Sequence, residues 1–230
     1  MNNKYITSQK KALSWLKTNT INHQGIITTS EQRVCYNEVT GYLIPTLIDY
    51  GEISLASQYA NYLKTVQNPN GSFNGVDGKE YVFDTGQVLR GLIKMAQKND
   101  QYINAATRAS EYISTRIQGN GRIQSDWEGI INENVHVYIL PALLEAGQFL
   151  DNQLFYEKAM LSLDYYKKNF SEEILHDELT HFSAYIIVIA LSFLSLSQST
   201  LSRKLRNYLT LLFTFALLIT GAKIVFLFFF

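Results

Sequence analysis

The sequence predicts an all-α protein in which a helical hairpin is repeated along the chain. Two families of similar segments alternate at a period of about 47 residues, which is typical of repeat architectures. In both families apolar residues lie three and four positions apart, the spacing of one helix face. Only three prolines occur in 230 residues, 47% of which are hydrophobic, so a loop-dominated or disordered chain is excluded.

The first family has three copies that align without gaps, at offsets of 45 and 51: GYLIPTL (41–47), GQVLRGL (86–92) and VYILPAL (137–143). A fourth copy, AYIIVIAL, follows at 184–191. We expect the first three to form helices over 41–50, 86–97 and 137–148. Because proline is tolerated only near the first turn of a helix, Pro45 and Pro141 should mark where two of these helices begin.

The second family lies between these copies and comprises LSWLKT (13–18), ANYLKTVQ (60–67), SEYISTRI (110–117) and LDYYKKNF (163–170). Its aromatic residues Trp15, Tyr62, Tyr112 and Tyr165 recur at intervals of 47, 50 and 53. We expect helices over 54–67, 102–117 and 154–169. Glycine-bearing turns, HQGII, PNGSF and GNGRI, follow the first three copies, and glycine there supplies the left-handed backbone that ends a helix.

Charge distinguishes the two helices of each hairpin. The three expected helices of the first family carry four charged residues in total, whereas those of the second carry nine. The first set should therefore face protein and the second should face water. Inner helices surrounded by outer helices describe an α/α toroid, or part of one, formed by an array of αα-hairpins over residues 1–200.

The triplet Asp84-Thr85-Gly86 has two incompatible interpretations. It is the catalytic triplet of aspartic proteases, but those enzymes place it in a tight turn of an all-β fold. Here an amphipathic helix follows at once, and Asp84 with Gln87 three residues later resembles a capping pair. We therefore reject the protease, and we expect Thr40 to cap the preceding inner helix in the same way.

The segments EVTGYLIPTLIDYGE, QNPNGSF and VFDTGQVLRGL resemble bacterial proteins of the six-hairpin, (α/α)6-toroid superfamily. The resemblance covers residues 1 to about 190 and is strongest to polysaccharide-biosynthesis proteins related to the helical domain of glucuronyl C5-epimerases. It implies a role in carbohydrate metabolism, since glycoside hydrolases and polysaccharide lyases share the toroid. A full toroid has six hairpins and this chain supplies about three and a half, so the resemblance is to an incomplete ring. The DxDD motif of squalene-type cyclases and the Cys-Cys-His zinc set of lanthionine cyclases are absent.

In such a toroid the inner helices are parallel, so the residues before each of them line one common mouth. We expect the catalytic residues of an enzyme to be Glu38, Asp84, His136 and Tyr138. The expected substrate-binding residues are Tyr36, Asn37, Tyr81, Gln87, Asp126, Trp127 and His181. Aromatic rings stack on pyranose faces and amides bond sugar hydroxyls, while helix N-termini favour anionic sugars, so the expected ligand is an acidic oligosaccharide or polysaccharide.

Each of these residues also has a purely structural interpretation. Asp84 is explained equally well as a helix cap, and the acid Glu38 complements the dipole of a first helical turn. His136 and His181 lie at helix starts, where hydrogen-bonded structural histidines are commoner than catalytic ones. The tyrosines suit packing, and Asp126 with Trp127 suits a solvated loop.

Two functions of different classes follow. The first is an enzyme that cleaves a glycoside with paired carboxylates or epimerises a uronate by proton abstraction, with Glu38 and Asp84 as the pair. The second is a non-catalytic helical array that binds a glycan or a partner protein, which includes an inactive fragment of such an enzyme.

Composition excludes some kinds of cross-link and binding site. A single cysteine, Cys35, excludes an internal disulfide and a cysteine-based zinc site, and we expect no metal and no cofactor. All 20 acidic residues lie at or before Glu178, so residues 1–178, with 16 basic residues, carry a net charge of −4. A nucleic-acid surface is therefore not expected.

The C-terminal segment 201–230 is a basic linker followed by an apolar run. Residues 208–230 are long enough to span a bilayer and would anchor a cytoplasmic protein to the inner membrane, since the N-terminus has no secretory signal. The abrupt loss of acids fits a frameshifted end equally well. An incomplete ring leaves its last inner helix uncovered, so self-association is expected.

Overall fold

The computed structural model describes residues 3–29, 31–124 and 133–169. The chain divides into two compact units, Met1–Tyr165 and Tyr166–Phe230. The first unit contains almost all of the described residues, and of the second only 166–169 are described. The fourth repeat copy at 184–191 and the segment 201–230 lie outside the described residues.

The described residues form helices and contain no β-strand, only isolated bridges, which confirms the all-α class. The α-helices are α1 (Asn3–Thr18), α2 (Asn37–Asp49), α3 (Ile53–Val66), α4 (Val82–Ala96), α5 (Ile103–Arg116), α6 (Leu140–Phe149) and α7 (Gln153–Asn169). Two short 3-10 helices, η1 (Asp100–Tyr102) and η2 (Glu133–Ile139), precede α5 and α6. Among the described helices, none is long and apolar enough to cross a membrane.

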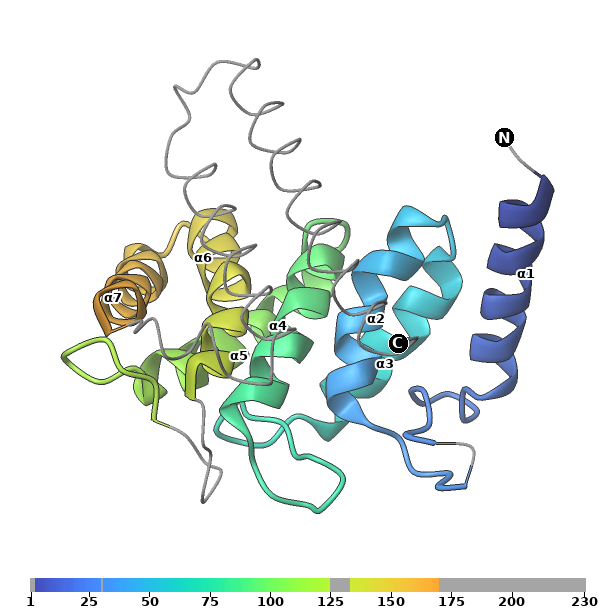
Figure 1. Cartoon of the computed structure of the whole chain (residues 1–230), viewed down its shortest axis with the longest axis horizontal. Helices are drawn as coiled ribbons and strands as arrows, with labels where there is room; N and C mark the ends of the chain where they lie inside the picture. Colours follow the sequence, from blue (N-terminus) through green and yellow to red (C-terminus); the bar gives the residue numbers. More distant parts are fainter. Residues whose placement is uncertain (1–2, 30, 125–132, 170–230) are drawn as a thin grey trace, which may run out of the picture. The chain divides into compact units, whose positions relative to one another are not determined.

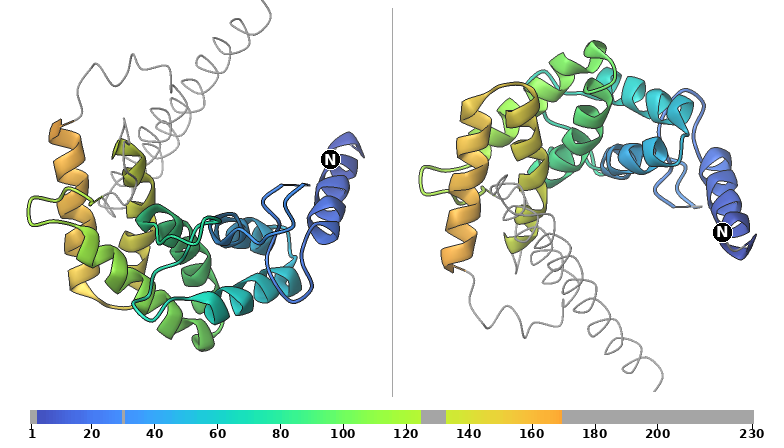
Figure 2. Two further views of the ribbon diagram at one scale, coloured as in Figure 1. Left: turned by 90° about the horizontal axis from the view of Figure 1, so that it is seen from below. Right: turned by 90° about the horizontal axis from the view of Figure 1, so that it is seen from above.

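The helices pair into hairpins in the order that the repeat predicts. α2 packs against α3, and α4 packs against α5. α4 also lies between α2 and α6 and contacts both of them (Figure 1). In the views from below and from above, α2, α4 and α6 form an inner row and α3, α5 and α7 form an outer row (Figure 2). The outer helices α3, α5 and α7 begin and end within one residue of their predicted bounds.

Burial explains why the inner helices carry so few charges. In α4, 12 of 15 residues are buried, because α2, α5 and α6 all pack against it. α3 and α5 bury one face only. Small and apolar residues such as Ala56, Leu63, Ala106 and Ile113 form this face, and exposed polar residues form the opposite one. The predicted division between an inner and an outer row is therefore observed.

A repeated pair of hydrogen bonds fixes where α2 and α4 begin. The backbone N–H of the buried turn residue Phe73 donates to Thr85 Oγ1 over 3.0 Å, and that hydroxyl donates to the Tyr81 carbonyl over 2.8 Å. In the preceding repeat, Ile26, Thr40 and Tyr36 form the same pair of bonds, at 3.2 and 2.7 Å. These residues repeat at offsets of 47 and 45, which confirms the sequence register.

These hydrogen bonds also show why the capping predictions were wrong. Thr40 lies inside α2 and bonds the preceding turn, so it does not cap the helix. α4 begins at Val82, two residues before Asp84, and its N-cap residue Tyr81 makes no side-chain cap bond. Asp84 and Gln87 are both interior residues of α4 and are not a capping pair. The protease triplet is nevertheless excluded, because all three residues lie within helix α4 and not in a tight turn of a β fold.

The predicted starts of the three inner helices were also wrong: α4 begins at Val82 and not at 86, and α6 begins at Leu140 and not at 137. α2 begins at Asn37, four residues before Gly41, so Pro45 is in the helix interior. Pro141, by contrast, does lie in the first turn of α6, as predicted. Pro45 has no N–H to donate to the Gly41 carbonyl, and α4 approaches that carbonyl so closely that a Cβ at Gly91 would lie 2.3 Å from its oxygen.

The glycine turns are confirmed in part. Gly71 and Gly121 have φ angles of 91° and 93°, so they adopt the left-handed backbone that glycine permits. Both lie within the turn and not at the helix end, since α3 ends at Val66. In the first turn the left-handed residue is His23, with φ of 57°, while Gly25 packs against the Thr40 side chain.

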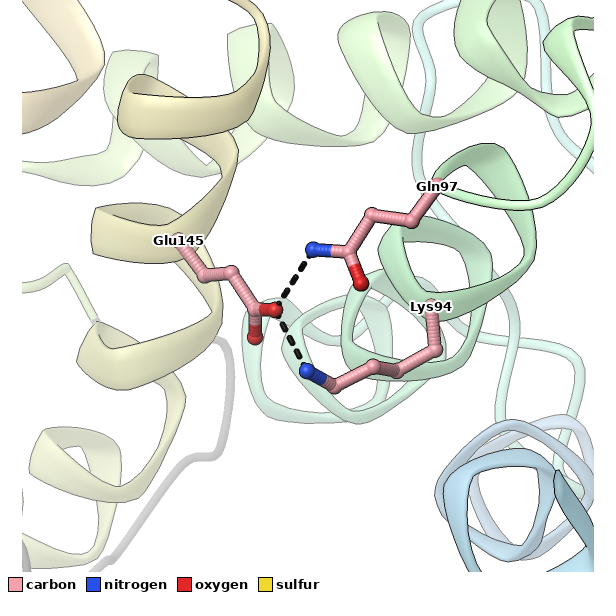
Figure 3. Close-up of polar contacts among 3 residues, drawn as sticks. All are labelled: Lys94, Gln97 and Glu145. Atoms are coloured by element: carbon pink, nitrogen blue, oxygen red, sulfur yellow. Dashed lines mark hydrogen bonds and ion pairs between the residues drawn. The ribbon is translucent and has the colours of Figure 1, made fainter. Parts of the chain in front are cut away.

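A polar cluster joins the C-terminal halves of α4 and α6. Lys94 Nζ lies 2.6 Å from Glu145 Oε1, and Gln97 Nε2 donates to the same oxygen over 2.8 Å (Figure 3). Replacing Glu145 with glutamine is expected to lower the free energy of unfolding by about 1 kcal/mol at low salt, since the pair is only partly exposed. The loss should shrink in 0.5 M NaCl.

Urea unfolding at low and high salt measures this effect. Glu157→Gln, on the solvent side of α7, is the matched control and should change stability little. Equal stability of Glu145→Gln and the wild-type protein at low salt would show that the cluster contributes nothing.

Candidate functional site

The starts of the three described inner helices lie side by side. Gly86, near the start of α4, packs so closely on Ile139, at the end of η2, that a Cβ there would lie 2.3 Å from its side chain. On the other side, the charge of Glu38 in the first turn of α2 raises the pKa of Asp84. Six predicted site residues from α2 and α4 therefore gather in one region: Tyr36, Asn37, Glu38, Tyr81, Asp84 and Gln87.

Asp84 is the central residue of this region. Its side chain is 1% exposed, and neither carboxyl oxygen has a hydrogen-bond partner in the described part of the chain. Burial, together with the charges of Glu38 and Asp77, raises the pKa of this carboxyl to about 7. A carboxyl with its pKa raised in this way keeps its proton to higher pH than a free side chain, which suits a proton donor.

Glu38 is the second carboxyl, held in the first turn of α2 and half-buried. Burial raises its pKa, and a hydrogen bond with the Tyr36 side chain opposes that rise. Burial and the charges of Asp84 and Glu38 raise the pKa of Tyr36 far above its usual value, so the phenol keeps its proton. The hydrogen bond from Tyr36 favours the ionised form of Glu38, and the charge of Glu38 in turn favours the protonated form of Asp84.

Two amide side chains flank the carboxyls and offer further polar atoms. Both amide atoms of Gln87, which is 1% exposed, lack a hydrogen-bond partner among the described residues. Asn37 donates to the Asn74 carbonyl over 2.8 Å, but its Oδ1 has no partner there. A buried polar group without a partner costs about 1–3 kcal/mol, and such groups gather where function requires them.

Tyr81 connects the site to the loop before α4. Its hydroxyl donates to Asp77 Oδ2 over 2.6 Å, and this bond lowers the pKa of the exposed Asp77 carboxyl. A Cβ added to Gly75 would lie 2.8 Å from the Tyr81 ring and 3.2 Å from Asp84 Oδ2. The glycine thus allows this loop to pass directly beside the buried carboxyl.

His136, one of the expected catalytic residues, precedes α6. It lies in η2, is 1% exposed, and burial lowers its pKa to about 4, so it is neutral near pH 7. In the repeat register, 51 residues after Thr85, it occupies the position of the hydroxyls that fix the starts of α2 and α4. This position favours a structural role.

Tyr138 is half-buried and leads to a residue that sequence reasoning missed. Arg90 of α4 donates from Nη1 to the Tyr138 hydroxyl over 3.2 Å, and its guanidinium lies 4.6 Å from the centre of the Tyr138 ring. The ring of Phe83 stacks on Tyr138 with centroids 6.2 Å apart. A signal for Arg90 was present, because it stands in register with Pro45 and Pro141.

The remaining predicted residues, Asp126, Trp127 and His181, lie outside the described residues. Within the described ranges no group of three metal-ligating side chains comes together. No known protein family, curated protein or solved structure matches the chain. The geometry of the residues is therefore the basis for any functional conclusion.

Proposed function

We propose that the protein acts on a carbohydrate of bacterial surface polysaccharide metabolism, with the chemistry at Asp84. The observation that carries this proposal is a buried carboxyl, without a hydrogen-bond partner among the described residues, beside a second carboxyl. The resemblance to partial (α/α)6 toroids supports the same class of substrate. The hairpin array contributes by bringing the starts of α2 and α4 together.

The two carboxyls have the unequal environments that glycoside chemistry requires. In a hydrolysis, Asp84 donates its proton to the glycosidic oxygen as the bond from that oxygen to the anomeric carbon breaks. Glu38, as the carboxylate, takes a proton from the water that adds to that carbon. In a uronate epimerisation, Glu38 removes the proton from C5 and Asp84 supplies one to the opposite face.

The neighbouring side chains supply binding groups for sugar hydroxyls. Gln87 offers a donor and an acceptor, and Asn37 offers one amide oxygen. Tyr36 and Tyr138 present aromatic rings, of which the first also orients Glu38. These four residues fit a pyranose better than they fit an apolar ligand.

The proposal extends to partners and location. The converging N-termini of the inner helices support an acidic oligosaccharide or polysaccharide as the ligand. The composition of residues 208–230 supports a cytoplasmic protein held at the inner membrane. The apolar character of the fourth repeat copy supports self-association.

Replacing Glu38 with glutamine tests the proposal. Turnover of a panel of acidic and neutral polysaccharides should fall by roughly 100-fold or more, the effect of losing a general base. The thermal midpoint should change little, because glutamine can still accept the Tyr36 hydrogen bond. Reducing-end release reports hydrolysis, and incorporation of deuterium from D2O at C5 reports epimerisation.

Glu111→Gln, on the exposed face of α5, is the matched control and should leave turnover unchanged. A collapse of the thermal midpoint in Glu38→Gln would make Glu38 a structural residue. If the wild-type protein binds a glycan of the panel without converting it, the non-catalytic binding function replaces the enzymatic one.

A further inference from the structure

Arg90 is a cation on α4, the most buried helix of the described chain. No acidic residue among the described ones forms an ion pair with it. The two ion pairs among the described residues are Lys17–Glu52 and Lys94–Glu145, and neither involves Arg90. Its only polar partner in the described ranges is Tyr138. A guanidinium has five N–H donors, so most of its hydrogen-bonding capacity is not used by these residues.

The aromatic contacts orient Arg90 before any ligand arrives. Its guanidinium lies over the Tyr138 ring, and Phe83 supports that ring from the first turn of α4. A guanidinium stacked on an aromatic face loses less rotational freedom when it binds, which favours the two-point recognition of a planar carboxylate. Lysine at this position would provide charge but not the paired donors.

The position of Arg90 on α4 connects it to the carboxyl site. Gln87 lies three residues before Arg90, on the same side of the helix, and Asp84 lies three residues before Gln87. Six residues correspond to about 9 Å along the helix axis. The same six residues turn the helix by about 240°, so Asp84 and Arg90 point about 120° apart and Gln87 lies between them on the helix surface.

Charge balance indicates what Arg90 would bind. Glu38 and Asp84 give the site negative character, which opposes an anionic sugar unless a cation compensates it. The other cation on this side of α4, Lys94, is already paired with Glu145. We propose that Arg90, held by Tyr138 and next to Gln87, forms a subsite for the carboxylate of a uronic acid residue. This inference rests on the proposed carbohydrate function and specifies its substrate class.

Binding to matched ligand pairs tests the subsite without any need for turnover. The probes are short oligosaccharides of glucuronic, galacturonic and mannuronic acid, each paired with its carboxyl-reduced, neutral counterpart. With the full-length chain, calorimetry should show tighter binding of at least one acidic member than of its neutral partner. Arg90→Gln should weaken the acidic ligand by roughly 10- to 100-fold and leave the neutral one unchanged.

Two further variants keep the result interpretable. Arg90→Lys should restore part of the lost affinity, and Arg33→Gln, an exposed loop residue, removes the same charge elsewhere and should change nothing. Binding of acidic and neutral ligands with equal affinity, unaffected by Arg90→Gln, would overturn the subsite and leave the carbohydrate function intact. If the wild-type protein binds no acidic or neutral ligand, the carbohydrate function fails and the subsite fails with it.

Discussion

Replacing Asp84 with asparagine is expected to stabilise the protein at pH 8 and to abolish its activity. In the folded protein the pKa of Asp84 is about 7, well above the value of 3.8 for a free side chain, so folding disfavours the ionised carboxylate. The resulting loss of stability is absent below about pH 4, grows between pH 4 and pH 7, and is complete above that range. Asparagine carries no charge at any of these pH values, so the loss should disappear.

The three-unit pKa difference sets an upper limit of about 4 kcal/mol on the gain at pH 8. The asparagine amide stays buried without partners, so we expect a gain of about 1–3 kcal/mol. Urea unfolding at pH 4, 6 and 8 measures it, and the two proteins should differ least at pH 4. Asp49→Asn, at the exposed end of α2, is the control and should show no such trend. A less stable Asp84→Asn at pH 8 would mean that the carboxylate has a favourable partner.

The arrangement of helices could be predicted because the same pattern occurs several times. Apolar spacing in three aligned copies fixes the register, and a mistake in one copy is corrected by the others. The outer helices α3 and α5 were therefore placed within one residue. The bounds of an outer helix can be predicted from local sequence alone, because a helix that buries one face shows that face as a regular apolar spacing.

The helix starts could not be predicted in the same way, because long-range bonds decide them. Thr85 Oγ1 accepts from Phe73, twelve residues earlier, and the helix begins where that bond and its bond to Tyr81 can both form. In sequence, a buried interior threonine or aspartate looks the same as a capping one. Only the packing of α2 beside α4 reveals that Asp84 is enclosed.

The roles of the site residues stay predictions, but the position of some of them follows from the repeat. Glu38 and Asp84 do lie close together, since both stand at inner-helix starts that the repeat aligns. Arg90 was overlooked because a lone cation in an apolar helix suggests exposure. The better signal was that Arg90 aligns with a proline in each of the other two copies, Pro45 and Pro141. A position that is proline in two copies and arginine in the third is not explained by helix packing alone.

The closest approach of α2 and α4 leads to the second large effect. Proline at position 45 leaves the Gly41 carbonyl without its helical donor, and that oxygen faces α4 at Gly91. A Cβ at Gly91 would lie 2.3 Å from the oxygen and 2.9 Å from Ile44 Cδ1. Because the oxygen belongs to backbone, the two helices must move apart before alanine can fit.

Gly91→Ala is therefore expected to destabilise the protein by about 2–4 kcal/mol, although alanine favours a helix by about 1 kcal/mol over glycine. For a unit of this size the thermal midpoint should fall by about 4–16 °C. Gly119→Ala, which meets nothing within 4 Å, should change it little. Pro45→Ala restores the N–H that draws the Gly41 carbonyl back to its own helix, so the double variant should be more stable than the sum of the two single effects. Strict additivity in this cycle would show that the carbonyl at Gly41 does not set the distance between α2 and α4.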